Sequence, residues 1–224
     1  MGKLIVIEGL DGSGKTTQTA IVAEELRRQG KDVKVISFPD YKSPSASLVN
    51  MYLQGDFGER PSEVNAYAAS SFYAVDRYAS YNKEWKEFYE RTDSIVLATR
   101  YTTSNEIYQL AKIKRDDWDD FIDWAEDFEY GKLGLPQPDA VFYLDMKYEI
   151  AKKLIDSRSA ETGQAKDIHE LDDIYMQQCH KAAAYALGRL GWKNIVCYSD
   201  KAPLTPEEIT ETILTELVTL LDMS

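Results

Sequence analysis

Five short apolar runs rich in β-branched residues recur along the chain, and much longer segments of mixed polarity separate them. Runs without polar alternation are expected for strands that helices cover on both faces, as in a parallel sheet. The intervening segments are long enough to hold crossover helices. The runs are 4–7, 33–37, 94–98, 140–144 and 194–198. The pattern predicts an α/β fold in which a five-stranded parallel sheet lies between two layers of helices.

Apolar periodicity and helix start and stop signals predict the helices. They are expected at 15–29, 63–91, 104–128, 147–157, 172–190 and 206–221. Two polar stretches, 42–61 and 158–170, read as exposed loops, and long loops in compact domains often act as lids or binding loops. A length of 224 residues suits one domain, 1–224, with a lid at about 158–170.

The net charge and the cysteine content of the chain exclude several kinds of function. The chain carries 26 Lys and Arg against 38 Asp and Glu, a net charge of −12. A chain with this negative net charge and no stripe of basic residues is not expected to bind polymeric nucleic acid. Its two cysteines have neither metal-ligand nor redox-motif spacing, and the N-terminal apolar run is too short for a signal peptide or a membrane span. A cytoplasmic protein without a membrane partner is expected.

A glycine-rich segment links the first apolar run to the first expected helix. Its sequence, Gly9-Leu10-Asp11-Gly12-Ser13-Gly14-Lys15-Thr16, matches GxxxxGK[ST] in the strand-to-helix context that a phosphate-binding P-loop requires. Such glycines let successive backbone N–H groups converge on phosphate oxygens at a helix N-terminus. Lys15 would then reach the β- and γ-phosphates, and the Thr16 hydroxyl would bind Mg²⁺. The expected nucleotide-binding residues are Gly9, Asp11, Gly12, Ser13, Gly14, Lys15, Thr16 and Thr17.

Further segments, taken in order with this loop, resemble the thymidylate kinase family, whose members phosphorylate dTMP with ATP. They are 38–41 (FPDY), 72–77 (FYAVDR), 100–105 (RYTTSN), Tyr108 and 134–139 (GLPQPD). The resemblance spans nearly the whole chain. It implies a P-loop kinase fold with a lid, the substrates ATP and dTMP, Mg²⁺ as cofactor, and a homodimer.

Spacing indicates how some of these residues could act. Tyr73 and Arg77 lie four apart on an expected helix, so an aromatic ring could lie against a base while a guanidinium bonds its edge. Arg100 follows an expected central strand, where open α/β sheets bind ligands, and could clamp the acceptor phosphate. Asn105 and Tyr108 lie three apart and can face one pocket, and Ser104 is a candidate helix N-cap.

The resemblance assigns more specific roles. It implies that Asn105 reaches the thymine, Tyr108 the sugar, and Asp11 the 3′-hydroxyl, and that Phe38 packs on the acceptor. The substrate-binding set is therefore Asp11, Phe38, Tyr41, Tyr73, Arg77, Arg100, Ser104, Asn105 and Tyr108. Lys15, Arg100 and the lid residue Arg158 form the expected catalytic set, because basic residues that neutralise transition-state charge accelerate phosphoryl transfer.

Two positions depart from the family pattern. Thr99 stands where the family has an aspartate near the metal, and Tyr41 stands where some relatives have an arginine. Losing a carboxylate near Mg²⁺ can weaken metal binding, slow the chemistry or alter substrate choice. Two alternatives therefore stay open: a kinase for another deoxynucleotide or a deoxynucleoside, and a non-catalytic nucleotide-binding relative.

Overall fold

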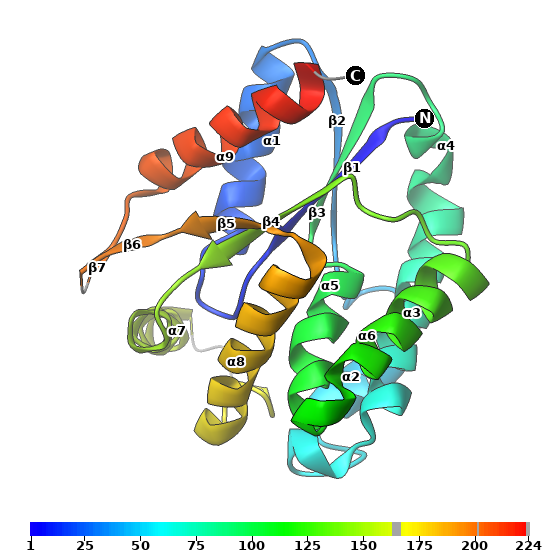
Figure 1. Ribbon diagram of the computed structural model, residues 1–224, viewed down its shortest axis with the longest axis vertical. Helices are drawn as coiled ribbons and strands as arrows, with labels where there is room; N and C mark the ends of the chain where they lie inside the picture. Colours follow the sequence, from blue (N-terminus) through cyan, green and yellow to red (C-terminus); the bar gives the residue numbers. More distant parts are fainter. Residues whose placement is uncertain (163–166, 201, 223–224) are drawn as a thin grey trace.

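A central parallel sheet organises the protein, whose computed structural model describes residues 1–162, 167–200 and 202–222. The strand order is β2-β3-β1-β4-β5, and each neighbouring pair is parallel (Figure 1). The strands are β1 (Lys3–Glu8), β2 (Asp32–Ser37), β3 (Ser94–Thr99), β4 (Ala140–Asp145) and β5 (Lys193–Val196). The predicted α/β fold with a five-stranded parallel sheet is confirmed.

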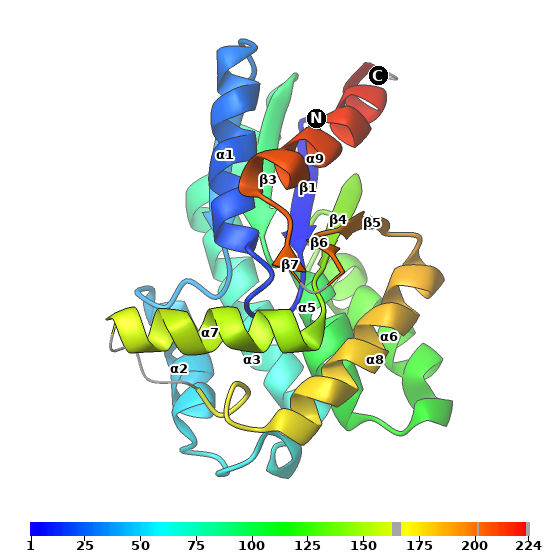
Figure 2. The same cartoon turned by 90° about the vertical axis from the view of Figure 1, so that its left-hand side faces the viewer.

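Helices cover both faces of this sheet. They are α1 (Lys15–Arg28), α2 (Ser47–Gln54), α3 (Ala66–Ser80), α4 (Lys86–Tyr89), α5 (Thr102–Ser104), α6 (Trp118–Glu126), α7 (Tyr148–Thr162), α8 (Asp173–Leu190) and α9 (Pro206–Asp222). Helices α1 and α9 lie together on one face, while α3, α6 and α8 lie on the other (Figures 1 and 2). Helix α7 crosses near the end of β1 at which the phosphate loop begins (Figure 2).

Alternation within β1 explains the layers. Ile5 and Ile7 pack into the cluster formed with α1 and α9, whereas Leu4 and Val6 pack into the opposite cluster with Trp85. All five residues are completely buried. Both faces of the central strand are therefore apolar, and its carboxyl end carries the loop that leads into α1.

Several predicted element boundaries are wrong. The expected helix 104–128 is interrupted: a π-helical turn, Asn105–Gln109, and a 3-10 turn, Leu110–Lys112, precede a break before α6. The expected helix 63–91 begins only at Ala66, where the Asn65 side chain accepts hydrogen bonds from the next backbone N–H groups. The stretch 42–61 is not a continuous loop, because it contains α2.

The C-terminal part of the chain also differs from expectation. The fifth strand ends at Val196, and the following residues form an antiparallel pair, β6 (Tyr198–Ser199) with β7 (Ala202–Pro203). The stretch 158–170 is not one exposed loop, because α7 extends to Thr162 and His169 is buried.

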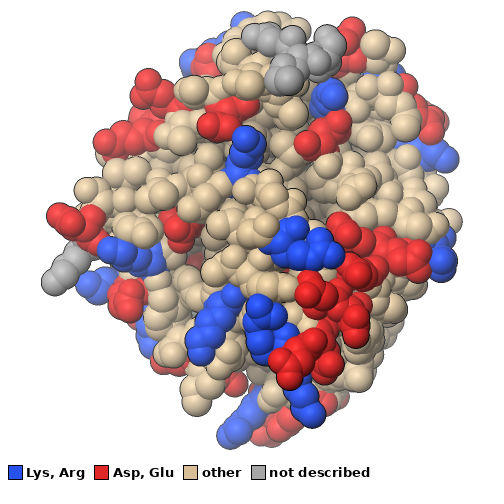
Figure 3. Space-filling view, viewed as in Figure 1, with Lys and Arg blue, Asp and Glu red and all other residues tan. Residues whose placement is uncertain are grey.

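Acidic side chains predominate on the face seen in Figure 3, where they follow the line of α6. Among the described residues, no helix combines the length and the apolarity that a membrane crossing requires.

Candidate nucleotide-binding site

The phosphate loop joins β1 to α1 and has the backbone geometry that its glycines predict. Gly12 and Gly14 have φ angles of 78° and 89°, in the left-handed region that favours glycine. Gly12 also lies against α7, where an added Cβ would come within 2.6 Å of the Ala151 carbonyl oxygen. Nζ of Lys15 donates to the Leu10 carbonyl oxygen at 2.8 Å, so the lysine lies across its own loop. The loop can therefore surround an anion.

Two hydroxyl groups of the loop suit a magnesium–phosphate ligand. The Ser13 Oγ is buried and has no hydrogen-bond partner within the described part of the chain. Thr16, in the first turn of α1, is exposed. The described residues form no group of three or more His, Cys, Asp or Glu side chains able to hold a metal ion. Mg²⁺ is commonly held by few protein ligands together with substrate phosphates and water, so this loop fits the ion.

Asp11 joins the phosphate loop to the neighbouring pocket. One carboxylate oxygen pairs with Arg100 Nη2, and the other accepts from the Tyr108 hydroxyl at 2.9 Å. Lys15 Nζ lies 3.9 Å from the same carboxylate. Burial alone would raise the pKa of Asp11, but the Arg100 and Lys15 charges outweigh burial and hold that pKa well below its usual value. Asp11 is thus a fixed anion between two cations.

Glu8 binds Arg100 and the first residue of the phosphate loop, and so holds both beside Asp11. It is completely buried at the end of β1, accepts from Gly9 N at 2.9 Å, and has Arg100 Nη1 within 3.8 Å. The Thr103 and Ser104 hydroxyls donate to its other oxygen at 2.6 and 2.7 Å. The expected N-cap role of Ser104 is therefore wrong, because its hydroxyl is committed to Glu8 and the helical segment already starts at Thr102.

A pocket, here called the acceptor pocket, opens beside Asp11. Its walls come from the phosphate loop, the segment after β2, α2, α3, the segment after β3, and the segment that follows residue 166. It is lined by Asp11, Pro39, Tyr41, Leu53, Tyr73, Arg100, Ser104, Tyr108, Gln109, Asp167 and His169. Six of the nine predicted substrate-binding residues are thus brought together. The guanidinium carbon of Arg100 lies 5.1 Å from the centre of the Tyr108 ring, which holds the two side chains together.

Arg77 and Asn105 do not line this pocket. Arg77 is 1% exposed and donates through Nε and Nη2 to the two Glu129 oxygens at 2.6 and 2.5 Å. Asn105 Nδ2 and Thr102 Oγ1 also donate to Glu129, at 3.0 and 2.8 Å. The geometry expected from helix spacing, with Arg77 beside Tyr73 in one pocket, is not found, because a buried carboxylate that no sequence motif marks binds the arginine.

Phe38 also lies behind the acceptor pocket rather than in its wall. It is 3% exposed, and its ring centre is 5.9 Å from that of Tyr101. The peptide bond between Phe38 and Pro39 is cis, and it is Pro39 that lines the pocket.

Thr99, at the end of β3, is 6% exposed. Its hydroxyl donates to the Thr19 hydroxyl of α1 at 2.8 Å. The position at which the family has an aspartate is therefore packed directly against the helix that carries Lys15 and Thr16.

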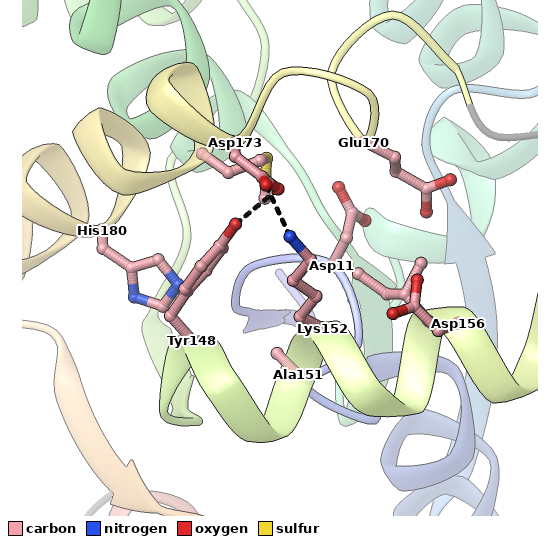
Figure 4. A pocket seen from close by; sticks show the side chains of 10 residues that line it. Asp11, Tyr148, Ala151, Lys152, Asp156, Glu170, Asp173 and His180 are labelled. Atoms are coloured by element: carbon pink, nitrogen blue, oxygen red, sulfur yellow. Dashed lines mark hydrogen bonds and ion pairs between the residues drawn. The ribbon is translucent and has the colours of Figure 1, made fainter.

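A second hollow lies on the other side of Asp11, between α7 and α8 (Figure 4). Lys152 and Tyr148 from α7 both reach Asp173 at the start of α8, at 2.5 and 2.7 Å. The side chain of Arg158, the expected lid residue, lies outside the described residues.

Sequence reasoning missed four residues around the site: Glu8, Glu129, Asp167 and His169. Glu8 had a local signal, since a carboxylate directly after a buried apolar run must find donors inside the protein. Glu129 had none, because it reaches the site through contacts between segments far apart in the sequence. Asp167 and His169 lie in the stretch 158–170 that was expected to form a lid, but no signal marked these two residues within it.

Comparison with known proteins agrees with this geometry. The sequence profile of the thymidylate kinase family matches residues 7–207. The thymidylate kinase of Mycobacterium tuberculosis is 31% identical over 192 residues, which cover 84% of this chain and 87% of that one. The Arabidopsis thaliana thymidylate kinase is 27% identical over 216 residues, 96% of this chain and 72% of that one.

A solved structure shares the fold. The thymidylate kinase of Candida albicans, described as having broad substrate specificity, superposes with a TM-score of 0.71 at 21% identity, over 97% of this chain and 92% of that one. The profile match and the Mycobacterium relative establish descent, and the chain belongs to the thymidylate kinase family.

Proposed function

We propose that this protein is an ATP-dependent nucleoside-monophosphate kinase that transfers the γ-phosphate of ATP to dTMP, giving ADP and dTDP. One observation carries the proposal: Asp11 links the phosphate loop to a pocket lined by Tyr73, Arg100 and Tyr108. Two anionic substrates can thus approach each other from opposite sides of one loop.

Catalysis would rest on positioning and charge neutralisation. The phosphate loop and Lys15 would hold the ATP phosphates, and Arg100 would bind the acceptor phosphate. An acceptor phosphate is already ionised at neutral pH, so no general base is needed. Alignment of the two phosphates and neutralisation of their charge account for most of the rate gain in phosphoryl transfer. Arg158, from the lid, is proposed as the additional transition-state cation.

Mg²⁺ is the proposed cofactor, held by Thr16 together with ATP phosphates. When bound, it would neutralise charge on the transferring phosphate. The remaining residues would position the acceptor: Tyr73 would offer a ring face to the base, and Tyr108, whose hydroxyl donates to Asp11, would contact the sugar. Tyr41 is proposed to contact the acceptor phosphate through its hydroxyl. Arg77, Asn105 and Phe38 would act from behind the pocket.

An assay of ADP release with Mg-ATP and a panel of acceptors tests this proposal. The panel holds dTMP, dUMP, dCMP, dAMP, dGMP and thymidine. We expect dTMP to give the highest kcat/KM. Turnover with another acceptor but not with dTMP would favour the first alternative. If nucleotides raise the melting temperature while no acceptor reacts with Mg²⁺ or Mn²⁺, the protein is a non-catalytic relative.

We also propose that the protein acts as a cytoplasmic homodimer. Helix α3 exposes Tyr67, Val75 and Tyr78, and the neighbouring α2 exposes Leu48 and Met51. Exposed large apolar side chains on neighbouring helices are typical of an interface. Light scattering coupled to size-exclusion chromatography should give twice the 25.5 kDa chain mass, and charged substitutions at Val75 and Tyr78 should shift it to the single-chain mass.

A further inference from the structure

A chain of hydrogen bonds runs from Lys112 through Tyr52 to His169. Lys112 Nζ lies 2.7 Å from the Tyr52 hydroxyl oxygen, and that oxygen lies 2.8 Å from His169 Nε2. Lys112 also donates to the Val64 carbonyl oxygen at 3.3 Å. Tyr52 is completely buried and His169 is 5% exposed. The three side chains come from a 3-10 turn, from α2 and from the segment after residue 166, so the contact depends on the tertiary fold.

Counting donors limits the direction of these bonds. The Lys112 ammonium has only donors, so the Tyr52 oxygen accepts from it. Gln109 also hydrogen-bonds Tyr52, and the single phenolic proton of Tyr52 is available for His169 Nε2, which accepts it in the arrangement proposed below. A neutral imidazole carries one N–H, and when Nε2 accepts, the proton lies on Nδ1.

The protonation states of His169 and Lys112 follow from their burial and from the charges around them. Burial, reinforced by the Lys112 charge, lowers the pKa of His169 to about 3, so the imidazole is neutral near pH 6. Burial lowers the pKa of Lys112 to about 7, so at pH 6 the ammonium form predominates. The other charged groups that act on His169 are Asp11, which favours its protonation, and Arg100, which opposes it.

His169 is also part of the acceptor pocket, which it lines with Asp11, Arg100 and Tyr108. Its ring stacks on the Tyr108 ring, with centres 5.5 Å apart and planes 17° from parallel. Within residues 1–162, 167–200 and 202–222, no hydrogen bond reaches Nδ1. An Nδ1–H group would therefore be a donor available to a ligand, on a ring that stacks against the tyrosine proposed to contact the sugar.

We propose that Lys112 and Tyr52 are positioning residues that fix His169 as its Nδ1–H tautomer, so that His169 donates a hydrogen bond to an oxygen of the acceptor nucleotide. The identity of that nucleotide rests on the proposed function, but the tautomer does not. The oxygen belongs to the sugar or to the phosphate, since the pocket presents groups for both.

Nuclear magnetic resonance of protein labelled with ¹⁵N-histidine tests the tautomer directly. The chain has only two histidines, so a His180→Gln variant assigns both, and His180 serves as the internal control. At pH 6 we expect the two-bond ¹H–¹⁵N pattern of an Nδ1–H imidazole for His169 in the unsubstituted protein. We expect the Nε2–H form to gain population in Tyr52→Phe, which keeps the ring and removes the hydroxyl. An Nε2–H pattern in the unsubstituted protein, or no change in Tyr52→Phe, would overturn the proposal whether or not the protein is a kinase.

Calorimetric titration with dTMP tests the donor role. His169→Gln keeps a polar group near the Nε2 position and loses Nδ1, whereas His169→Asn keeps one near Nδ1. We expect His169→Gln to weaken dTMP binding about tenfold and His169→Asn to weaken it less, with ATP affinity unchanged in both. Equal losses in the two variants, or an equal loss of ATP affinity, would contradict the proposal.

Thymidine, which lacks the phosphate, identifies the oxygen. The difference between the two variants persists with thymidine if the bond goes to the sugar, and it vanishes if the bond goes to the phosphate. A difference seen with neither dTMP nor thymidine would refute the donor role of His169.

Discussion

Replacing Glu129 with glutamine should lower the free energy of unfolding by about 3–5 kcal/mol, because the buried Arg77 cation then loses its counter-charge. Both side chains are 1% exposed, so water cannot compensate for the loss. Glu129 accepts two hydrogen bonds from Arg77 and one each from Thr102 and Asn105. Glutamine keeps the shape and one acceptor oxygen, but its amide group faces donors.

The effect should be large in a melting experiment. For a chain of this size, each kcal/mol shifts the melting temperature by roughly 2–4 °C, so the expected fall is about 6–20 °C. Urea unfolding followed by the fluorescence of the four tryptophans gives the free energy itself. The denaturant slope should not change, because the native and unfolded states keep their compactness.

A double variant separates the ion pair from a general packing defect. Arg77→Met combined with Glu129→Gln removes both charges and leaves the glutamine oxygen to accept from Thr102 or Asn105. We expect the double variant to be more stable than Glu129→Gln alone. A loss below 1 kcal/mol in Glu129→Gln, or a double variant as unstable as the sum of the two single variants, would contradict a stabilising role of the Arg77–Glu129 ion pair.

Three further predictions concern the site. Lys15→Met should lower kcat by at least about 10²-fold with little change in melting temperature, measured by ADP release. Thr99→Asp should raise turnover above that of the unsubstituted protein, because a carboxylate is restored beside α1, while the uncharged control Thr99→Asn should not. An unchanged or lower rate in Thr99→Asp would show that the threonine is not a simple loss of function. Folding lowers the Lys112 pKa from 10.5 to about 7, so between these pH values the unfolded chain binds more protons than the folded one. The free energy of unfolding should therefore rise with pH across this range, by on the order of 1 kcal/mol per pH unit. Urea midpoints measured for Lys112→Met should lack this rise.

The central architecture could be predicted because its signals are local. A buried parallel strand needs an unbroken apolar run, and a phosphate loop needs glycines and a lysine at fixed spacing, so β1 and the loop after it are visible in the sequence. The interiors of the helices were harder to predict from the sequence. The segment after β3 has helical periodicity, but the hydroxyls of Thr103 and Ser104 bind Glu8, and π-helical and 3-10 turns replace a regular helix there.

For the acceptor pocket, the sequence predicted which residues take part better than it predicted how they are arranged. Asp11, Arg100 and Tyr108 meet as expected, because each follows a strand or a loop whose position the fold determines. Arg77 does not, since its partner Glu129 lies 52 residues away and nothing in the spacing reveals it. His169 lies in the stretch expected to form a lid, but the sequence did not mark it individually, because its burial depends on Tyr52 and Tyr108, which come from two other segments.

The most direct test of the proposed phosphoryl transfer follows the labelled phosphate itself. Purified protein is incubated with Mg²⁺, γ-³²P-ATP and dTMP, and the nucleotides are separated, with Lys15→Met as the control. We expect label in dTDP for the unsubstituted protein and almost none for the variant. Label that stays in ATP, or that appears only as inorganic phosphate while dTMP is unchanged, would contradict the proposed transfer.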